Sequence, residues 1–396
     1  MKYKLSEIFE KPISGEWGNE LEEGKYGAKV IRTTNFTNMG RLNLNDIVER
    51  DIDVEKYKNK LLKLGDIIIE KSGGSPNQPV GRVVIFEENT SEKYFCNNFT
   101  SILRPKNIVD AKYSLYLLKD LYNKKRVLKY QNKTTGIINL KLNDYLNNTE
   151  IMIPSIEEQI KISTILDKSQ ELIDKRKEQI EALDELVKSK FIEMFGDPIT
   201  NPINWEKKKL AEECNIITGN TPPRKVGEYY GDYIEWIKSD NITDDGIYLT
   251  KAREYLSEEG LKVGRSVEEN SILMTCIAGS IKCIGNVAIA NRKVTFNQQI
   301  NGIEPLKNNV YFMFEQFNLS QKYIQSTINM SLKGILSKGQ LSELEFIFPP
   351  IEKQNEFAEF FKQVDKLKFE MEKSLKELED NFNSLMQKSF KGELFK

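Results

Sequence analysis

Val30-Ile31-Arg32-Thr33-Thr34-Asn35-Phe36 returns 206 residues later as Trp236-Ile237-Lys238-Ser239-Asp240-Asn241-Ile242. Two further segments repeat in the same order: Gly81–Ile85 returns as Gly285–Ile289, and Ile153–Gln159 returns as Phe348–Gln354. A preserved order with small drifts in spacing indicates internal duplication with insertions and deletions in the loops. The duplication predicts two copies of one domain related by approximate two-fold symmetry, which suits a target that has two parts.

The length and charge of the chain set wide limits on its class. A chain of 396 residues can form two or three domains, each with its own core. The 58 basic and 59 acidic side chains nearly cancel, so net charge neither demands nor excludes a nucleic-acid partner. Residues 1–7 lack the apolar run of a signal peptide, and no stretch reaches the roughly 18 apolar residues of a membrane span. We therefore expect a cytoplasmic protein.

The composition lowers the expectation of an enzyme. The sequence has no histidine, which removes the commonest general base and the commonest zinc ligand. The four cysteines (Cys96, Cys214, Cys276 and Cys283) form no Cys-x-x-Cys pair, so buried or idle thiols are expected. No segment has the spacing of a phosphate loop or a dinucleotide fingerprint. We predict no catalytic residue, no metal site and no cofactor bound by this chain.

The pattern of strands, loops and helices divides the chain into four segments. Short β-like runs such as Ile67–Glu70 and Val83–Phe86 alternate with turn-rich loops in residues 1–153, and the pattern recurs in residues 199–348. Residues 154–198 and 349–396 read as long helices. The predicted fold class is therefore α+β (mixed α/β), with two globular domains separated by two helical spacers.

Each long helix carries an apolar repeat. Ser155 and Glu158 form a predicted capping box at the start of the first helix, and Gly196 and Pro198 end it. Apolar residues seven positions apart predict a coiled-coil seam. The seam residues are Leu166, Ile173, Ile180, Leu183 and Val187 in the first helix, and Phe357, Val364, Met371, Leu378 and Leu385 in the second. The helices could pack on their own domains, but their matched lengths and repeats favour antiparallel pairing with each other.

Basic and polar side chains gather in corresponding places in the two copies. Residues 121–143 carry six basic residues and no acid, and residues 316–342 carry three lysines and no acid. Such stretches favour phosphate contact over an ordinary basic surface. Nearby loops are rich in the side chains that read base edges in the grooves of DNA, although the same residue types also populate ordinary turns.

These observations select candidate DNA-binding residues in both copies. In the first copy they are Arg32, Thr33, Asn35, Lys71, Ser72, Ser75, Asn77, Gln78, Arg82, Lys124, Lys125, Arg126 and Lys133. In the second copy they are Lys238, Ser239, Asn241, Thr275, Ser280, Lys282, Lys333 and Lys338.

The order of several motifs resembles the specificity subunit of type I restriction-modification systems, the HsdS family. Residues 218–223 (Thr-Gly-Asn-Thr-Pro-Pro) and 229–237 (Tyr-Tyr-Gly-Asp-Tyr-Ile-Glu-Trp-Ile) are similar to the opening of a target recognition domain. Residues 154–159 and 349–354 resemble the start of the family's helical spacers, and residues 194–198 and 389–395 resemble their ends. Residues 12–27 depart from the pattern, because they lack the Gly-Thr-Pro opening.

The resemblance implies a mechanism without chemistry in this chain. Each recognition domain would read one half of a bipartite site in double-stranded DNA, and the paired helices would fix the gap between the halves. The helices would also dock two methyltransferase subunits, which carry S-adenosylmethionine and methylate adenine N6. Restriction subunits that use ATP and Mg²⁺ would join for cleavage. Two other hypotheses stay open at this point: a self-contained DNA-modifying enzyme, and a duplicated protein–protein adaptor without a DNA role.

Overall fold

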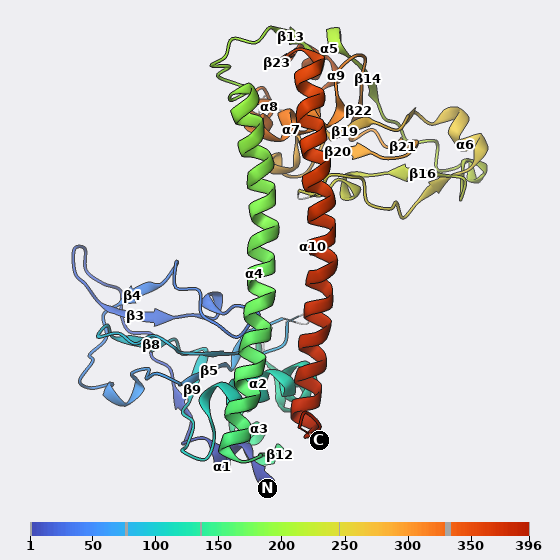
Figure 1. Ribbon diagram of the computed structural model, residues 1–396. Coiled ribbons are helices and arrows are strands. Elements are labelled where there is room, and N and C mark those ends of the chain that lie inside the picture. The colour runs from blue at the N-terminus through green and yellow to red at the C-terminus, as the bar shows by residue number, and fades with distance from the viewer. Residues whose placement is uncertain (1, 76–77, 135–136, 245, 329–333, 396) are drawn as a thin grey trace. The chain divides into compact units, whose positions relative to one another are not determined.

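The chain forms two compact units. The computed structural model describes residues 2–75, 78–134, 137–244, 246–328 and 334–395. Unit 1 comprises Met1–Arg176 and Ser374–Lys396, and unit 2 comprises Lys177–Lys373. Each unit therefore combines one globular domain with parts of both long helices, α4 (Ile156–Phe195) and α10 (Ile351–Lys391) (Figure 1). No helix in the described part of the chain is long and apolar enough to cross a membrane.

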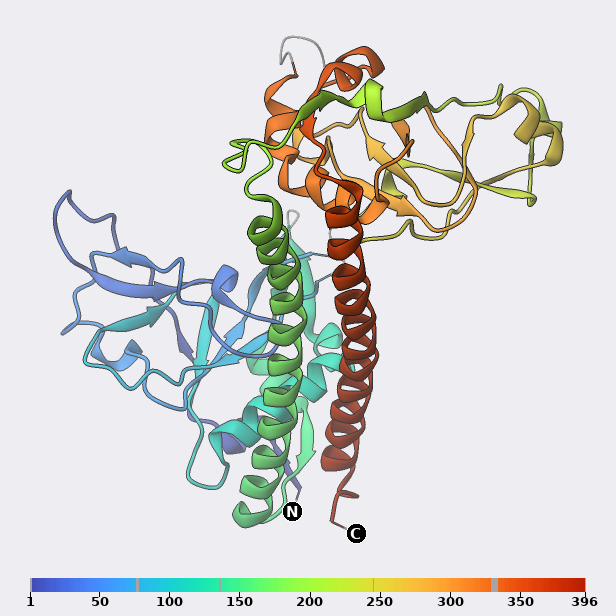
Figure 2. The ribbon, with the colours of Figure 1, turned by 45° about the horizontal axis from the view of Figure 1, so that its top comes forward.

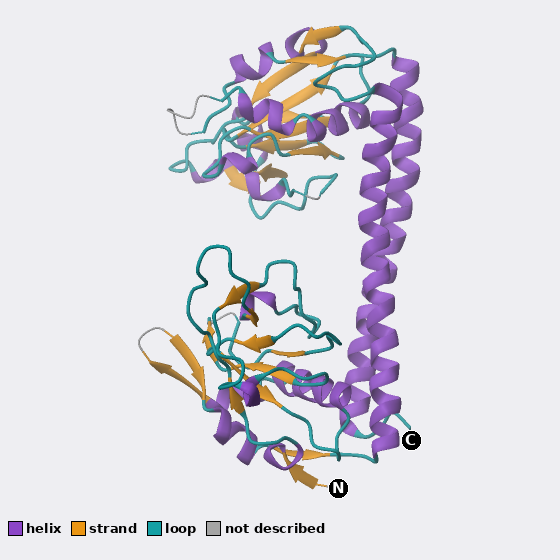
Figure 3. Cartoon of the chain, turned by 90° about the vertical axis from the view of Figure 1, so that its left-hand side faces the viewer, coloured by secondary structure: helices purple, strands orange, loops and turns teal. Residues whose placement is uncertain are grey.

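The domain of unit 1 mixes small sheets with short helices (Figure 3). Its sheets are β1 (Lys2–Lys4) with β12 (Glu150–Met152); β2 (Ile13–Ser14), β9 (Thr100–Leu103), β5 (Ile67–Glu70) and β7 (Val83–Ile85); β4 (Val48–Arg50), β3 (Ala28–Ile31) and β8 (Tyr94–Cys96); and β10 (Gln131–Thr134), β11 (Ile137–Leu140) and β6 (Ser72–Gly74). Its helices are α1 (Leu5–Ile8), α2 (Ala111–Asn123) and α3 (Leu142–Asn148), with 3₁₀ turns η1 (Thr33–Asn35), η2 (Lys58–Lys60) and η3 (Arg126–Tyr130).

The domain of unit 2 repeats this plan with different loops. Its sheets are β13 (Lys207–Lys209) with β23 (Glu345–Ile347); β14 (Cys214–Thr218), β22 (Ile300–Pro305), β19 (Ser271–Thr275) and β20 (Val287–Ala290); and β15 (Tyr230–Gly231), β17 (Tyr255–Leu256), β16 (Ile234–Ile237), β21 (Val294–Phe296) and β18 (Ser266–Val267). Its helices are α5 (Leu210–Glu213), α6 (Glu258–Val263), α7 (Val310–Leu319), α8 (Gln321–Ser326) and α9 (Lys338–Glu343), with η4 (Gly227–Tyr229), η5 (Ser239–Asn241) and η6 (Ile281–Cys283).

Strand pairing shows that the two domains share one topology. In unit 1, Ile67 of the central strand β5 pairs with Leu103 and Ile85 in antiparallel register. In unit 2, Ile272 of β19 pairs in the same way with Ile303 and Ile289. The parallel pair β3–β8 of unit 1 likewise matches the parallel pair β16–β21 of unit 2. The duplication predicted from the sequence is therefore a duplication of the fold.

Both long helices contribute to the core of each unit. In unit 1, Leu166 of α4 and Met386 of α10 are buried in one cluster with residues of α2. In unit 2, the ring of Phe191 on α4 lies 5.3 Å from that of Phe357 on α10. Figures 1 and 2 show α4 and α10 as continuous helices, and both marked chain ends belong to unit 1.

Contacts within unit 2 give the relative direction of the two helices. Asp184 of α4 accepts a hydrogen bond from Lys368 of α10 at 2.6 Å, while Phe191 contacts Phe357. Residue numbers thus rise along one helix as they fall along the other, so the pairing is antiparallel. Of the predicted seam, six residues are buried and four are half-buried. The buried ones are Leu166, Ile173, Leu183, Val187, Phe357 and Val364, and the half-buried ones are Ile180, Met371, Leu378 and Leu385. Coiled-coil geometry itself stays a prediction.

A buried glutamine ties the first turn of each long helix to its domain. Gln159 is fully buried, accepts a hydrogen bond from the backbone N–H of Asp110 at 2.9 Å, and donates to the carbonyls of Ile108 and Pro154. Asp110 is the N-cap of α2. The predicted capping box of Ser155 and Glu158 lies one turn earlier and is confirmed.

The second copy has the same clamp. Gln354 is 1% exposed and accepts a hydrogen bond from the N–H of Asn309, the N-cap of α7, at 2.9 Å. Its amide donates to Asn308 and to the carbonyl of Pro349, both at 2.8 Å. Each clamp therefore joins three pieces of chain: the strand exit before the long helix, the long helix itself and the cap of the domain's main helix.

The clamp predicts a stability effect. Replacing Gln354 with Leu keeps a similar volume but leaves the Asn309 N–H and two acceptors without their buried partner. We expect the free energy of unfolding of unit 2 to fall by about 2–4 kcal/mol, measured by chemical denaturation of the full chain. Gln363→Leu, on the exposed side of the same helix, is the matched control and should change it by less than about 0.5 kcal/mol. Equal stability of the two variants would contradict the clamp.

Candidate nucleic-acid interface

In unit 1, sheet pairing brings two candidate segments together. The loop that leaves β5 continues as β6, and β6 pairs with β11 of the β10–β11 hairpin. Candidate Lys71 precedes β6, and candidate Lys133 lies in β10, although its side chain is outside the described residues. Candidates Asn77 and Lys333 also lie outside the described residues. The hairpin and the glycine-rich loop are therefore one structural feature.

Lys71 and Ser72 are half-buried at the base of this feature. The ammonium group of Lys71 donates to the hydroxyl of Ser14 at 2.6 Å, and its burial lowers its pKa below the ordinary lysine value. The hydroxyl of Ser72 donates to Oδ1 of Asn139 on β11. Further out, Ser75 and Gln78 are exposed, and the Ser75 hydroxyl accepts a hydrogen bond from the Gln78 N–H at 3.1 Å. The tip of the loop is thus the part that is open to a partner.

Arg82 is held by its own domain. Its Nε donates to Oε2 of the buried Glu70 at 2.8 Å, and its Nη2 donates to the other carboxylate oxygen at 3.2 Å. Nη2 also approaches the carbonyl of Thr33 at 3.4 Å. This two-point pairing occupies the Nε–Nη2 edge of the guanidinium, one of the edges that could pair with guanine. We therefore interpret Arg82 as a residue that positions the 33–35 turn beside β5.

The turn at residues 32–35 is also internally fixed. Asn35 is 3% exposed; its Oδ1 accepts from the N–H of Arg32, and its amide donates to the carbonyls of Asn43 and Asp46. Arg32 itself pairs with Asp46 at 3.0 Å. Asn241 repeats this arrangement in unit 2, where it is 5% exposed and caps its own turn. The two asparagines that the repeat made conspicuous therefore hold the turns from inside, and neither offers a free amide to a base.

In unit 2, the corresponding loop leaves β19 at Thr275 and returns at Gly285. Thr275 is 2% exposed, so its side chain belongs to the core. Ser280 accepts a hydrogen bond from the N–H of Lys282 and caps η6, and both side chains are exposed. Gln321 of α8 donates to the carbonyls of Lys282 and Ile284 at 3.2 and 3.3 Å. A short 3₁₀ turn anchored to α8 thus stands where unit 1 has β6.

Lys238 belongs to a cluster of cations and aromatic rings. Its ammonium group is bonded to Glu254 and lies 5.1 Å from the ring centre of Trp236. Arg224 pairs with the same carboxylate at 2.8 Å and lies over Tyr230 at 4.7 Å. The hydrogen bond from Lys238 is the main cause that lowers the pKa of Glu254. The neighbouring candidate Ser239 is half-buried. Both cations are therefore paired within the domain, and they share a single carboxylate.

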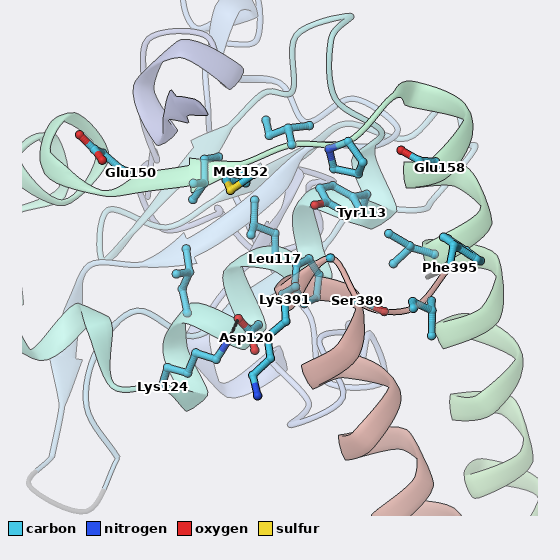
Figure 4. A pocket seen from close by; sticks show the side chains of 18 of the residues that line it. Tyr113, Leu117, Asp120, Lys124, Glu150, Met152, Glu158, Ser389, Lys391 and Phe395 are labelled. Atoms are coloured by element: carbon cyan, nitrogen blue, oxygen red, sulfur yellow. Dashed lines mark hydrogen bonds and ion pairs between the residues drawn. The ribbon is translucent and has the colours of Figure 1, made fainter. Parts of the chain in front are cut away.

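The basic stretch of unit 1 divides between two places. Lys133 lies on the hairpin, whereas Lys124 and Arg126 line a cavity of about 720 Å³ between β12, the end of α2 and the end of α10. Figure 4 shows Lys124 beside Asp120, to which it is bonded at 2.7 Å. Three bases (Lys124, Arg126 and Lys391) and three acids (Asp120, Glu150 and Glu158) line the cavity. The charges that line the cavity therefore balance, and Lys125, between the two lining bases, is exposed.

Lys338 and Cys283 are exposed, whereas the other three cysteines are buried. Lys338 is exposed in the first turn of α9. Cys96, Cys214 and Cys276 are buried, and burial raises the pKa of the Cys96 thiol to about 11. Cys283 is exposed. No group of acids and cysteines that could hold a metal ion occurs in the part of the chain that the structure describes.

The first domain opens in the same way as the second, although residues 12–27 lack the Gly-Thr-Pro motif. Gly15 donates to the carbonyl of Thr100, as Gly219 donates to that of Ile300. A Cβ at Gly15 would lie 2.0 Å from the Asn97 carbonyl oxygen, and one at Gly219 would lie 2.1 Å from that of Asn297. Residues 15 and 219 are therefore equivalent glycines at a close backbone crossing. Their spacing of 204 residues, the same as that of Gly81 and Gly285, was the available sequence signal.

Comparison with known proteins identifies one family. A family model described as a type I restriction modification DNA specificity domain matches residues 1–182 and 202–380. A protein described as the MjaX type I restriction enzyme specificity subunit of Methanocaldococcus jannaschii is 26% identical over 336 residues, covering 80% of this chain and 74% of the relative. The MjaIX type I restriction enzyme specificity subunit of the same organism is 28% identical over 173 residues, covering 42% of this chain and 39% of the relative.

Solved structures show the same fold. A chain from a type I R-M system aligns with a TM-score of 0.61 and 16% identity, covering 100% of this chain and 98% of that chain. The type I restriction-modification S subunit from M. genitalium aligns with a TM-score of 0.59 and 17% identity, covering 98% of this chain and 96% of that chain.

The buried asparagines lead to a prediction. Asn241→Ala would leave the Lys238 N–H and the Lys251 carbonyl without partners inside the turn. We expect it to lower the free energy of unfolding by about 1–3 kcal/mol, followed by thermal or chemical denaturation. The exposed neighbour provides the control, because Asp240→Ala should have little effect. A stable Asn241→Ala protein with a changed base preference would instead show that Asn241 reads DNA directly.

Proposed function

Because the chain belongs to the family of type I restriction-modification DNA specificity domains, we propose that its two globular domains each read one half of a bipartite DNA target. The chain is a non-catalytic DNA-recognition subunit of such a system, and its partners are DNA and the other subunits of that system. One observation carries the proposal: the central sheets of the two domains have the same strand order and register but different loops at the same place.

The loop difference is what two readers with separate targets require. At the end of the central strand, unit 1 has the ion pair of Glu70 and Arg82, and unit 2 has Thr275 and Asn286 in the equivalent backbone contact. Beyond it, unit 1 adds β6 and a hairpin, while unit 2 adds η6. Sequence is read by side chains that reach base edges, so different loops on one frame give different targets.

The exposed candidates are the ones best placed for contact. In unit 1 these are Ser75 and Gln78 at the loop tip, and in unit 2 they are Ser280 and Lys282 on η6. Lys125 and Lys338 are exposed bases suited to phosphates. Lys71 and Ser72 would support the unit 1 loop, and Asn77, Lys133 and Lys333 complete the proposed set. Arg82, Lys238, Asn35 and Asn241 would act by holding the loops.

The long helices would set the gap and dock partners. Antiparallel pairing of α4 and α10 supports a ruler whose length separates the two readers. Two methyltransferase subunits would bind the outer faces of these helices, and restriction subunits would join them. S-adenosylmethionine, ATP and Mg²⁺ would be held by those partners, so this chain would bind no cofactor.

The proposal predicts an interrupted methylation motif. Mapping methylated adenines in DNA from cells that contain the complex should give two short defined sequences separated by a gap of fixed length. A heptad inserted into α4 between Ile173 and Ile180, with a matching heptad in α10, adds about 10 Å to the helix pair. The gap should then lengthen by about three base pairs, while both half-sites stay the same. A continuous motif, or an unchanged gap in a folded variant, would contradict this function.

The exposed base of the unit 2 loop should contact phosphate. Lys282→Ala in the assembled complex should weaken binding to specific and unrelated DNA alike, and should reduce the slope of log K against log salt by about 1. Lys307→Ala is the matched control. Lys307 is an exposed lysine just after the C-terminal end of β22, whereas the η6 loop lies near the N-terminal end of that strand. A loss for Lys307→Ala as large as that for Lys282→Ala would show that only overall charge is being measured.

A further inference from the structure

Glu315 is an anomaly inside unit 2. This carboxylic acid lies on α7, which packs against α4 and α10, and it is 4% exposed. Its Oε1 is buried and has no hydrogen-bond partner among the described residues. A buried carboxyl oxygen without a partner costs free energy, so its retention calls for a physical reason.

The duplication supplies an internal comparison. Counted from the helix N-caps Asp110 and Asn309, Tyr116 of unit 1 is the counterpart of Glu315. The hydroxyl of Tyr116 donates to Oδ1 of Asp167 on α4 at 2.7 Å. A polar group at this position is therefore satisfied by the long helix in one copy. In the other copy it is not, so the open oxygen is a specific property of unit 2.

Glu315 lines a cavity of about 370 Å³ bordered by α7, both long helices and the loop after η5. Among the described residues, the charged ones that line the cavity are four acids and two lysines, which are Asp184, Asp244, Glu315, Asp365, Lys188 and Lys368. If all six are ionised, these residues carry a net charge of −2. The other walls are apolar and include Val187, Phe314 and Phe361.

Most of these charged groups already have partners. Lys368 is bonded to Asp184 at 2.6 Å, and Asp365 accepts a hydrogen bond from the hydroxyl of Tyr248 at 3.1 Å. Lys188 pairs with Glu185 at 2.8 Å on the surface of α4. Among these acids, Glu315 is the one with a buried carboxylate oxygen that lacks a hydrogen-bond partner in the described part of the chain, and it lines the cavity.

We propose that this cavity binds a short aliphatic diamine, with one ammonium group on the carboxylate of Glu315 and the methylene chain along the apolar wall. A dication matches the shortfall of charge, and an alkyl chain matches Val187, Phe314 and Phe361. A bare metal ion fits less well, because no cluster suited to metal occurs among the described residues. Occupancy would connect α7 of the recognition domain to both long helices.

The protonation of Glu315 gives the site a pH signature. Burial is the main cause that raises its pKa, to about 7, and the charge of Lys188 and a hydrogen bond from Asn318 oppose the rise. The facing charged groups are Asp184, Glu185 and Lys188 on α4, Asp365 and Lys368 on α10, and Asp244 in the loop after η5. An ammonium ion prefers the ionised carboxylate, so binding should be about tenfold tighter at pH 8 than at pH 6.

The test is calorimetric titration of the full chain, without DNA, with 1,4-diaminobutane at constant ionic strength. Saturable binding that strengthens from pH 6 to pH 8, and that weakens at least tenfold in Glu315→Gln, is the expected result. Glu269→Gln removes an exposed acid that does not line the cavity and should bind like the unaltered chain. Butylamine, with one ammonium group, should bind more weakly.

The folding of the variant can be checked independently. In the unaltered chain the free energy of unfolding should fall as pH rises from about 4.5 to 7, because the folded state holds the Glu315 proton over this range. Glu315→Gln removes this dependence, so its stability relative to the unaltered chain should rise across the same range. No saturable diamine binding, equal binding by Glu315→Gln, or binding independent of pH would overturn the proposal. Because DNA is absent, these outcomes leave the DNA-reading function untouched.

Discussion

The two buried glutamines that clamp α4 and α10 are the interaction on which the arrangement of each unit depends. A protein that reads a bipartite target must hold each globular domain at a fixed angle to its long helix. A single apolar contact would allow the domain to slide along that helix. Gln159 and Gln354 each satisfy three polar groups from two segments of chain outside their own helix, inside a core where an unsatisfied group is costly. Direction as well as distance is therefore fixed at the point where helix and domain meet.

In both copies, cations in the turns of the globular domains are paired with carboxylates of the same domain. Most conspicuous cations in the turns are already paired: Arg82 with Glu70, Arg32 with Asp46, and Lys238 and Arg224 with Glu254. This pairing explains how a protein with a net charge of −1 can be a DNA reader. The paired cations shape the loops, and a small number of exposed bases and amides remain for contact. Affinity would then owe much to partner subunits, while this chain supplies selection.

The sequence predicted the frame well because the frame is set by local patterns. Hydrophobic repeats, the capping box at Ser155 and the glycine at 196 depend on residues close in the chain, and the duplication multiplies each signal. The loop candidates were harder. Asn35 and Asn241 have the residue type that reads adenine, but the same amide groups suit a turn that needs an internal cap. Sequence alone does not distinguish the two roles, and in the structure both side chains make the hydrogen bonds of a cap.

The least predictable features come from contacts between segments distant in sequence. Nothing local marks Gln159 and Gln354 as clamps, since a glutamine in a first helical turn is normally solvated. Glu315 follows the run Val310–Phe314 on α7, and its burial follows from packing against α4 and α10. The comparison of copies is informative here: Tyr116 finds Asp167, whereas Glu315 faces a cavity. Loops that differ at equivalent positions would select different DNA targets, and the interiors of the two domains differ at an equivalent polar position too. A polar position satisfied in one copy and open in the other points to a ligand that only one copy meets.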